Sequence, residues 1–445
     1  MNKDIFKAYD IRGVYPTEIN EEAVVDIARA YVAYIKPKTV VVGRDVRTSG
    51  QSLLEAARKA LIEAGVDVVD IGTITTEMLF FEVANYGFDG GIAVTASHNP
   101  AEYNGLKMVK EEARPISMDT GLADIREIAA KDNFKLATKL GTIKEVDIID
   151  EYIKKLLTFI DKGLITKKKI VVNPNFGAAG KIVERLAIEL GLELVKLNFE
   201  ENGNFPKGRP DPLQEENRRE TTEIIKKTGA DFGVAWDADA DRCFFFDETG
   251  VFVDCYYEIV LLSQIVLDKY PGGKIIHDPR LIRAIQDSVQ EAGGIPLINK
   301  AGNVFIKERM KKEDAVFGGE TSGHFFFKDF YYCDNGMIPF LLILQRLCES
   351  GKQMSELVNP LRQKYPISGE LNYTVSNVEA KMIEIKEKYS DAMIGEIDGI
   401  SVSYSDWRFN VRASNTEPLV RLNIEAKTKA LVNQKIQELT ALIEE

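Results

Sequence analysis

The sequence lacks any apolar run long enough to cross a membrane. The longest, Met337 to Leu344, contains Pro339 and falls far short of the roughly 20 residues that a transmembrane helix needs. The opening residues, Met1 to Phe6, also lack the apolar core of a secretory signal. We therefore expect a cytoplasmic protein with no membrane partner.

Cysteine, histidine and excess positive charge are also scarce. The four cysteines have no paired spacing, which argues against a disulfide framework or a zinc site and fits a reducing compartment. A net charge of -12 disfavours nucleic acid as a partner, because nucleic-acid binding needs a basic surface. The three histidines, His98, His277 and His324, each fall in a polar loop. No Walker-type or kinase glycine loop occurs, so nothing supports an ATP donor.

What the sequence does contain is one pattern repeated three times. A strand, a polar loop, a helix, a glycine and a second strand follow one another from Thr39, from Ile170 and from Lys274. Because 445 residues are too many for a single core, this repetition predicts three similar α/β domains with mixed, mostly parallel sheets.

The pattern changes after Gly351. We expect a helix over 378–387, strands over 400–404, 407–411 and 419–425, a loop over 412–418, and a final amphipathic helix. These elements predict a smaller C-terminal α+β domain. The four expected domains span residues 1–146, 147–252, 253–367 and 368–445, arranged around a central cleft.

Each α/β copy also has a second strand that runs into a polar loop. These strands are expected at 91–95, 232–236 and 315–317, and the loops that follow carry Ser97, Asp237 to Arg242, and Gly318 to His324. Ligands bind α/β folds at the carboxyl ends of sheet strands, so we expect the three loops to meet in one cleft.

Ser97 lies in the turn Thr95-Ala-Ser-His-Asn-Pro100, which Pro100 ends because it cannot donate to a strand ladder. The turn is either a nucleophile delivered by a strand or an ordinary polar turn. We expect residues 104–107 to form a second turn that returns Lys107 toward Ser97. The opening stretch 6–13 is expected to end in a turn at Gly13.

Asp237, Asp239 and Asp241 alternate with alanines, which places three carboxylates on one side of an extended or tightly turned segment. Crowded carboxylates repel unless a cation neutralises them. Oxygen ligation favours Mg²⁺, Ca²⁺ or Mn²⁺ over zinc. The alternative is a solvated acidic turn.

Two further loops carry groups suited to a phosphosugar. Glu320, Ser322 and His324 lie among glycines and suit sugar hydroxyls, although a plain glycine-rich turn fits equally well. Arg412 is followed by Ser414, Asn415 and Thr416, a cradle for a phosphate dianion or else a solvated hairpin, and Arg421 adds a second charge. A serine nucleophile, a metal, a hydroxyl-binding loop and a phosphate cradle together indicate phosphoryl transfer on a phosphosugar.

The four loops resemble, in order and over essentially the whole chain, the signature loops of the α-D-phosphohexomutases. The stretches 104–117, 332–339 and 406–410 are similar to the bacterial phosphomannomutase branch. The resemblance implies that Ser97 is a phosphoserine, that Asp237, Asp239 and Asp241 hold one Mg²⁺ together with it, and that Lys107 is an acid or base. It also implies active-site roles for the following residues: Tyr9, Arg12, His98, Arg242 and His324 in catalysis, and Arg280, Lys300, Glu320, Ser322, Arg412, Ser414, Asn415, Thr416 and Arg421 in substrate binding.

The resemblance therefore implies interconversion of mannose 1-phosphate and mannose 6-phosphate through a hexose 1,6-bisphosphate, which also serves as activator. Rival expectations are a phosphoglucomutase or dual-specificity enzyme, a phosphoglucosamine mutase, and a non-catalytic phosphosugar sensor. Asn303 stands where some relatives carry histidine, so no proton transfer is assigned to it. The sequence leaves open whether the protein is a monomer or a homodimer.

Overall fold

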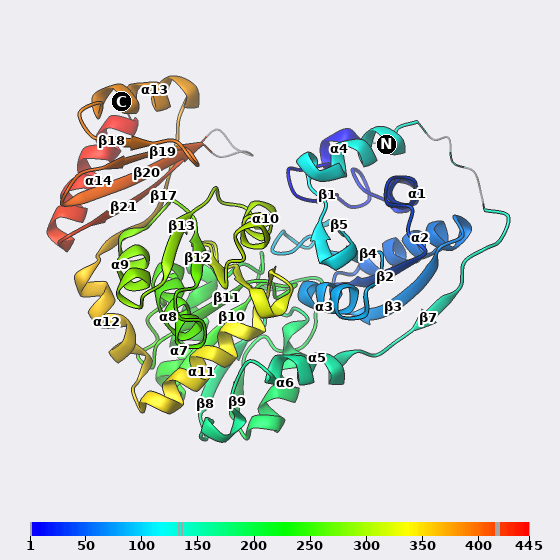
Figure 1. Cartoon of the computed structure of the whole chain (residues 1–445), viewed down its shortest axis with the longest axis horizontal. Coiled ribbons are helices and arrows are strands. Elements are labelled where there is room, and N and C mark those ends of the chain that lie inside the picture. Colours follow the sequence, from blue (N-terminus) through cyan, green and yellow to red (C-terminus); the bar gives the residue numbers. More distant parts are fainter. Residues whose placement is uncertain (1, 132–133, 135–136, 414–418, 445) are drawn as a thin grey trace. The chain divides into compact units, whose positions relative to one another are not determined.

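The computed structural model describes residues 2–131, 134, 137–413 and 419–444. The chain forms two compact units, one made of Met1–Phe252 with His324–Ser350 and the other of Val253–Gly323 with Gly351–Glu445 (Figure 1). No helix among the described residues is long and apolar enough to cross a membrane.

The first sheet of the first unit is mixed, with strand order β1-β5-β4-β2-β3-β7 and β6 (Arg114–Pro115) paired to β5. Strands β2, β3, β4 and β7 run parallel, and β5 is antiparallel to both β4 and β1. The strands are β1 (Ile11–Val14), β2 (Thr39–Arg44), β3 (Asp67–Thr73), β4 (Gly90–Val94), β5 (Tyr103–Lys110) and β7 (Ile143–Glu145).

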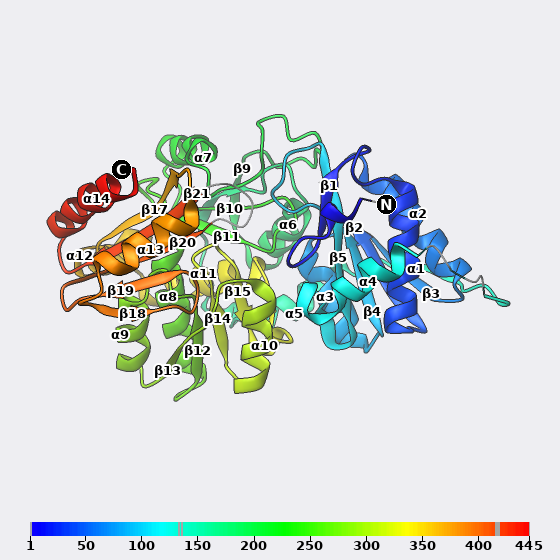
Figure 2. The same ribbon diagram turned by 90° about the horizontal axis from the view of Figure 1, so that it is seen from above.

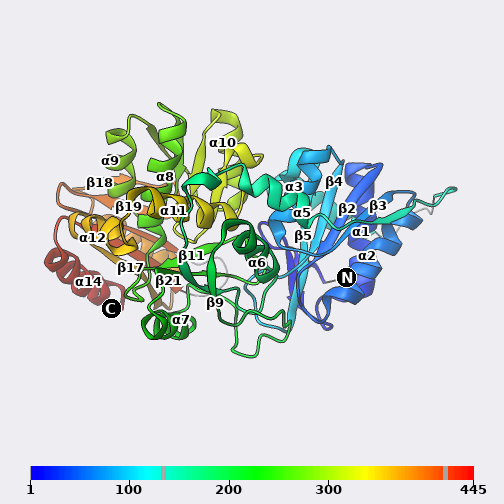
Figure 3. The ribbon, with the colours of Figure 1, turned by 90° about the horizontal axis from the view of Figure 1, so that it is seen from below.

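Helices cover both faces of this sheet. Helices α1 (Glu21–Ile35) and α2 (Gly50–Glu63) lie on the opposite side from α3 (Thr76–Tyr86) (Figure 3). Gly90 and Gly91 allow this close packing: a Cβ atom at Gly90 would lie 2.0 Å from the hydroxyl of Tyr31 on α1, and one at Gly91 would lie 3.0 Å from Leu79 on α3. Helix α4 (Ala123–Ala129) packs into the same core. Strand β4 lies in this core, and the Ser97 turn follows its end.

The second sheet has the order β11-β10-β8-β9, with β8, β9 and β10 parallel and β11 antiparallel. Its strands are β8 (Lys169–Asn173), β9 (Glu193–Lys196), β10 (Phe232–Trp236) and β11 (Cys243–Phe246), and its helices are α5 (Ile149–Leu157), α6 (Ala179–Leu190) and α7 (Glu215–Thr228). The same unit contains the antiparallel pair β15 (Phe325–Phe327) and β16 (Cys333–Asp334) and the buried helix α11 (Met337–Ser350). Trp236 donates a hydrogen bond to the Gly336 carbonyl (2.8 Å) and packs edge-on against Phe340, which ties α11 to β10.

The second unit begins with parallel strands β12 (Lys274–His277), β13 (Ile295–Ile298) and β14 (Phe317–Gly319). Its helices are α8 (Cys255–Lys269), α9 (Arg283–Glu291), α10 (Asn303–Glu313) and α12 (Met354–Lys364). An antiparallel sheet of order β17-β21-β20-β19-β18 follows, made of β17 (Ile367–Thr374), β18 (Met393–Gly395), β19 (Ile400–Ser403), β20 (Trp407–Ala413) and β21 (Leu419–Ala426).

The two faces of this antiparallel sheet differ in chemistry. Helices α13 (Val378–Lys388) and α14 (Lys429–Glu444) pack on one face against Phe409, Leu422 and their apolar neighbours (Figure 2). Because successive strand residues alternate in direction, the other face carries the polar residues of β20 and β21, including Arg412 and Arg421.

The expected fold class is confirmed: three α/β domains with mixed, mostly parallel sheets precede an antiparallel C-terminal domain. Each expected strand–helix–strand repeat is present, as β2-α2-β3, β8-α6-β9 and β12-α9-β13. The structure differs from expectation at Gly13 and at residues 315–317. Gly13 lies inside β1, not in a turn, because its backbone pairs with Asn104 of β5, and the expected strand over 315–317 is β14 at Phe317–Gly319, so both glycines of the expected loop belong to a strand.

Candidate active site

Ser97 follows the end of β4 in a tight turn. It has a φ of +48°, a left-handed conformation that few non-glycine residues adopt. The Ser97 amide donates to the Thr95 hydroxyl (2.9 Å), which holds the turn in this form. Strained backbone of this kind is concentrated at functional sites, so the conformation supports a functional role rather than an ordinary turn.

The Ser97 hydroxyl lies between an acid and an imidazole. Its Oγ is 3.1 Å from Oδ2 of Asp237 and 3.1 Å from Nδ1 of His98. Burial, followed by the positive charges of Arg242 and Arg12, lowers the pKa of His98 well below its ordinary value. His98 is therefore neutral near pH 7, and its Nδ1 can accept the hydroxyl proton of Ser97.

The three aspartates form a buried cluster in the turn between β10 and β11. Ala240, with a φ of +58°, bends the chain so that one carboxylate oxygen of each aspartate lies within 4.8 Å of the others. Burial raises the pKa of Asp237 to about 7, whereas Asp241, despite its burial, has a pKa well below the ordinary value because of Lys107 and His324.

The cluster fits a divalent cation. Oδ1 of Asp239 and Oδ1 of Asp241 are buried and have no hydrogen-bond partner within the described ranges. Such oxygens are costly to bury unless a cation or a donor meets them. All-oxygen ligation of this kind suits a hard divalent ion.

Lys107 contacts the cluster directly, but not from a turn. Residues 104–107 belong to strand β5, where Lys107 pairs with Ala93 of β4, so the expected second turn was wrong. Its Nζ lies 2.7 Å from Asp239 and 2.5 Å from Asp241. Although burial opposes the charge, these two carboxylates raise the pKa of Lys107 above its usual value.

Arg242 and His324 flank the same cluster, and their backbones form an isolated antiparallel bridge. Arg242 donates from Nε to Asp237 (2.8 Å), and its buried Nη2 has no hydrogen-bond partner among the residues that the structure describes. Nε2 of His324 lies 3.6 Å from Oδ1 of Asp241.

Arg12 approaches Ser97 from strand β1. It pairs with Asp10 (2.8 Å) and donates to the side chain of Asn99 (2.5 Å). Tyr9 is half-buried immediately before Asp10. The first unit thus contains Ser97, the three aspartates and the other residues of the expected catalytic set, Tyr9 included.

In the second unit, Glu320 and Arg280 lie close together. Glu320 is buried, accepts a hydrogen bond from the Gly302 amide (2.6 Å) and lies 3.9 Å from Nη2 of Arg280. Asp278 connects the two loops, because its Oδ2 accepts from Arg280 (2.8 Å) and from the Thr321 amide (2.7 Å). No role was predicted for Asp278 from the sequence.

Ser322, Lys300 and His277 belong to the same unit. Ser322 is half-buried in the turn after β14. Lys300 is exposed, with its ammonium 4.8 Å from the centre of the Phe305 ring. His277, expected in a polar loop, is instead the fully buried last residue of β12, and its Nδ1 contacts the Asp278 carbonyl.

Arg412 lies in β20, not in a loop as expected, because the strand extends to Ala413 and pairs Arg412 with Arg421 of β21. Nη2 of Arg412 lies 2.9 Å from Glu370 on β17. Ser414, Asn415 and Thr416 fall outside the described residues.

Arg47 makes many hydrogen bonds around the Ser97 turn that its sequence context did not indicate. Its fully buried guanidinium donates to four main-chain carbonyls of the Ser97 segment, at 2.6–2.9 Å: those of Ser97, Asn99, Pro100 and Tyr103. Its Nε pairs with Asp45 (3.1 Å), which also accepts from the Thr95 hydroxyl (2.7 Å). The signal available in the sequence was position, since the loop after β2 lies beside the loop after its parallel neighbour β4.

Thr76 was missed for a different reason. As the first residue of α3 it donates from its hydroxyl to Oδ2 of Asp239 (2.6 Å) and from its amide to the Asp239 carbonyl (2.9 Å). The amino end of a helix favours negative charge, so α3 supports the acidic cluster. Nothing in the sequence near Thr76 indicated this long-range contact.

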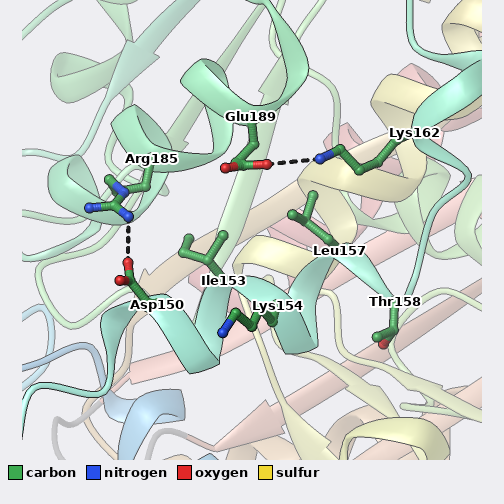
Figure 4. Close-up of a pocket in the computed structure, with 8 residues that line it drawn as sticks. All are labelled: Asp150, Ile153, Lys154, Leu157, Thr158, Lys162, Arg185 and Glu189. Atoms are coloured by element: carbon green, nitrogen blue, oxygen red, sulfur yellow. Dashed lines mark hydrogen bonds and ion pairs between the residues drawn. The ribbon is translucent and has the colours of Figure 1, made fainter.

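A cavity of about 490 Å³ lies elsewhere in the first unit, between α5 and α6 (Figure 4). Its apolar floor includes Ile153 and Leu157. Two ion pairs cross it, Lys162 with Glu189 and Arg185 with Asp150 (Figure 4). Because these four charged groups already pair with one another, the cavity does not compete with the Ser97 cluster as the candidate site.

Four family models match the chain in order. They describe the three alpha/beta/alpha domains (I, II and III) and the C-terminal domain of phosphoglucomutase/phosphomannomutase, and they match residues 3–136, 150–250, 256–365 and 370–442. The chain belongs to the phosphoglucomutase/phosphomannomutase family. It is therefore a phosphohexomutase, an enzyme that moves a phosphoryl group within a phosphosugar.

Individual relatives cover the full length of this phosphohexomutase. A protein of Xanthomonas campestris pv. campestris (strain B100) named "Phosphohexose mutases" is 46% identical, with 100% of both chains covered, and the "Phosphomannomutase" of Escherichia coli (strain K12) is 45% identical over 99% of both. The crystal structure of a phosphoglucomutase/phosphomannomutase family protein from Burkholderia thailandensis matches with a TM-score of 0.90 and 32% identity, covering 100% of this chain and 98% of that one.

Proposed function

We propose that this phosphohexomutase is a phosphomannomutase, which interconverts D-mannose 1-phosphate and D-mannose 6-phosphate through a phosphoserine at Ser97 and a 1,6-bisphosphate. The observation that carries the proposal is the Ser97 hydroxyl, held in a left-handed turn 3.1 Å from both Asp237 and His98. The mannose assignment is supported by full-length relatives named phosphomannomutase.

In the proposed cycle, phosphorylated Ser97 gives its phosphoryl group to the free sugar hydroxyl. The bond from phosphorus to Oγ breaks and a bond to the sugar oxygen forms, while the proton of that sugar hydroxyl ends on the released Ser97 oxygen. In the second half-reaction Ser97 Oγ attacks the other phosphate of the bisphosphate and passes its proton to neutral His98 at Nδ1. Lys107, protonated because of Asp239 and Asp241, can supply a proton to the departing sugar oxygen.

Asp237, Asp239 and Asp241 would hold one Mg²⁺ together with the Ser97 phosphate. When bound, the ion supplies positive charge that stabilises the negative charge shifting between oxygens during phosphoryl transfer. Arg242 adds a fixed cation on the same side, since its guanidinium touches Asp237 and keeps one buried donor without a hydrogen-bond partner in the described part of the chain.

The proposal assigns substrate recognition to the second unit. Glu320 would accept hydrogen bonds from sugar hydroxyls, and Ser322 would exchange hydrogen bonds with them. The phosphate that is not reacting would be held by Arg412, Ser414, Asn415, Thr416 and Arg421. Arg280 and Lys300 would add positive charge to the same substrate. The sugar must bind these groups in two orientations, one for each half-reaction. A fixed loop can contact the sugar in both orientations only through hydroxyls that exchange places between them.

Those hydroxyls are O3 and O4, which mannose and glucose share. No residue is assigned to the 2-hydroxyl, where the two sugars differ, so discrimination by fit alone should be on the order of 10- to 200-fold. The test is kcat/KM for mannose 1-phosphate and glucose 1-phosphate, with the bisphosphate activator supplied. We expect mannose to be favoured. A ratio favouring glucose by roughly tenfold or more, the low end of discrimination by fit, would make the enzyme a phosphoglucomutase.

A further inference from the structure

The polar face of the C-terminal sheet places two positive charges directly opposite each other. Arg412 on β20 is in register with Arg421 on β21. Like charges at opposed positions of an antiparallel sheet destabilise it. Some anion must therefore meet this pair.

Glu370 supplies that anion from the neighbouring strand. Asn372 of β17 pairs with Arg421, and Glu370, two residues earlier, projects from the same face. One of its oxygens, Oε2, lies 2.9 Å from Nη2 of Arg412, and the other, Oε1, lies 3.7 Å from Nη1 of Arg421. A single carboxylate thus spans both guanidinium groups.

The arginines keep capacity for a further anion. The Nε atoms of Arg412, Arg421 and Arg280 are buried and have no hydrogen-bond partner among the described residues. The Glu370 side chain is 33% exposed and that of Arg421 31%, so solutes can reach the pair. The three arginines therefore offer donors that one carboxylate does not use.

We propose that Glu370 is an internal competitor, a carboxylate that occupies the phosphate-binding arginines and weakens their hold on the sugar phosphate. This inference rests on the proposed function, in which Arg412 holds the non-reacting phosphate. A phosphate dianion carries more charge than a carboxylate and displaces it, but repulsion from Glu370 reduces the affinity. Because this loss applies equally to ground and transition states, it sets KM rather than kcat.

Weak binding at this position has a use in the reaction. The arginines hold one phosphate of the sugar in the first half-reaction and the other phosphate in the second. They must release the first before they can bind the second. An internal anion that returns to the arginines helps that release.

The test compares Glu370→Gln with the unmodified enzyme, using inorganic phosphate as a competitive inhibitor at constant ionic strength. We expect the inhibition constant and the KM of the sugar monophosphate to fall by about 1.5-fold to fivefold, the range for a partly exposed ion pair, with no rise in kcat. Glu370→Asp, whose shorter carboxylate cannot span both arginines, should lie between. Glu313→Gln, which removes a comparable carboxylate paired with Lys274 and Arg309, is the matched control and should change neither constant.

The same measurements in an Arg412→Ala background separate this inference from the function on which it rests. If Glu370 competes for Arg412, the tightening caused by Glu370→Gln disappears when Arg412 is absent. If Arg412→Ala weakens phosphate binding but Glu370→Gln weakens it too or leaves it unchanged, Glu370 only relieves repulsion between the arginines and the inference is wrong. If Arg412→Ala leaves phosphate binding unchanged, the proposed phosphate site itself is wrong.

Discussion

At the scale of single residues, the acidic cluster depends on compensation by neighbouring cations. Lys107 and Arg242 both contact the aspartates and carry raised pKa values, because each lies against carboxylates although burial opposes its charge. The buried oxygens of Asp239 and Asp241 that lack hydrogen-bond partners within the described residues show where compensation is incomplete. A divalent ion would complete it.

Replacing Asp239 by asparagine removes one charge from this cluster. We expect kcat to fall by about 10²- to 10³-fold, the size of losing one fixed electrostatic group at a reacting centre. The KM for the sugar phosphate should change far less, because the substrate-binding groups lie elsewhere. Steady-state kinetics across a Mg²⁺ titration measure both effects. Full activity in excess chelator, with metal analysis showing an empty site, would refute the metal requirement.

Arg47 tests whether the Ser97 turn must be held in place. Lysine at this position keeps the charge but cannot replace a guanidinium that donates to four carbonyls, so Arg47→Lys should lower kcat by about 10²-fold with little change in KM. The control is Arg58→Lys, which alters an arginine on helix α2 that pairs with Asp70 of strand β3. Equal losses of kcat and of melting temperature in both variants would show that Arg47 has no special connection with Ser97.

Ser97 and the three aspartates were predicted for one site from their local sequence pattern, and the structure places them close together. Ser97 and the alternating aspartates could be chosen because each group of residues lies at the end of a strand. Arg47 and Thr76 could not, because their roles come from contacts made 50 and 163 residues away in the chain. No local pattern records such distances.

At the scale of elements, helix α3 contains two buried acidic residues. Glu77 and Glu82 are both buried on it. Burial, together with the nearby Glu151, raises the pKa of Glu82 to about 7, although Lys144 opposes the shift. Above pH 7 the helix therefore carries a buried negative charge, and Oε2 of Glu82 has no hydrogen-bond partner in the described part of the chain.

This shift predicts a dependence of stability on pH. Because the pKa is higher in the folded state, the folded chain binds a proton that the unfolded chain releases, so stability is lost as pH rises from about 4.5 through 7. Glu82→Gln should therefore melt above the unmodified protein at pH 8, by on the order of 2 °C, and the difference should shrink at pH 5. The exposed Glu55→Gln is the control. A difference that is the same at both pH values would contradict the account.

Element type was predicted better than element boundary. All three strand–helix–strand repeats were recognised, because glycine stops and apolar periodicity act locally. The stretch 104–107 was misread as a turn because Asn104-Gly105 is a common turn pair. Its real conformation is set by pairing on both sides, with β1 and with β4. Arg412 was misplaced for the same reason, since the pairing of β20 with β21 continues past the last apolar residue.

At the scale of the whole molecule, the residues proposed for catalysis and those proposed for substrate recognition belong to different units. The serine, the acidic cluster and their cations belong to the first unit, whereas Glu320, Arg280 and the arginine pair belong to the second. The sequence predicted instead four domains that each contribute one loop to a common cleft, which stays a prediction. The three domain boundaries expected after residues 146, 252 and 367 stay a prediction.

The central claim is that Ser97 carries the phosphoryl group between two positions of one sugar. The most direct measurement is intact mass and peptide mapping of the protein after reaction with a hexose 1,6-bisphosphate, followed by addition of excess sugar monophosphate. We predict the gain of one phosphoryl group on Ser97, its loss to the added sugar, and neither event in Ser97→Ala, which should also lose most mutase activity. Full turnover by Ser97→Ala would contradict the account. So would phosphorylation at another residue whose phosphoryl group passes to the sugar at the rate of turnover.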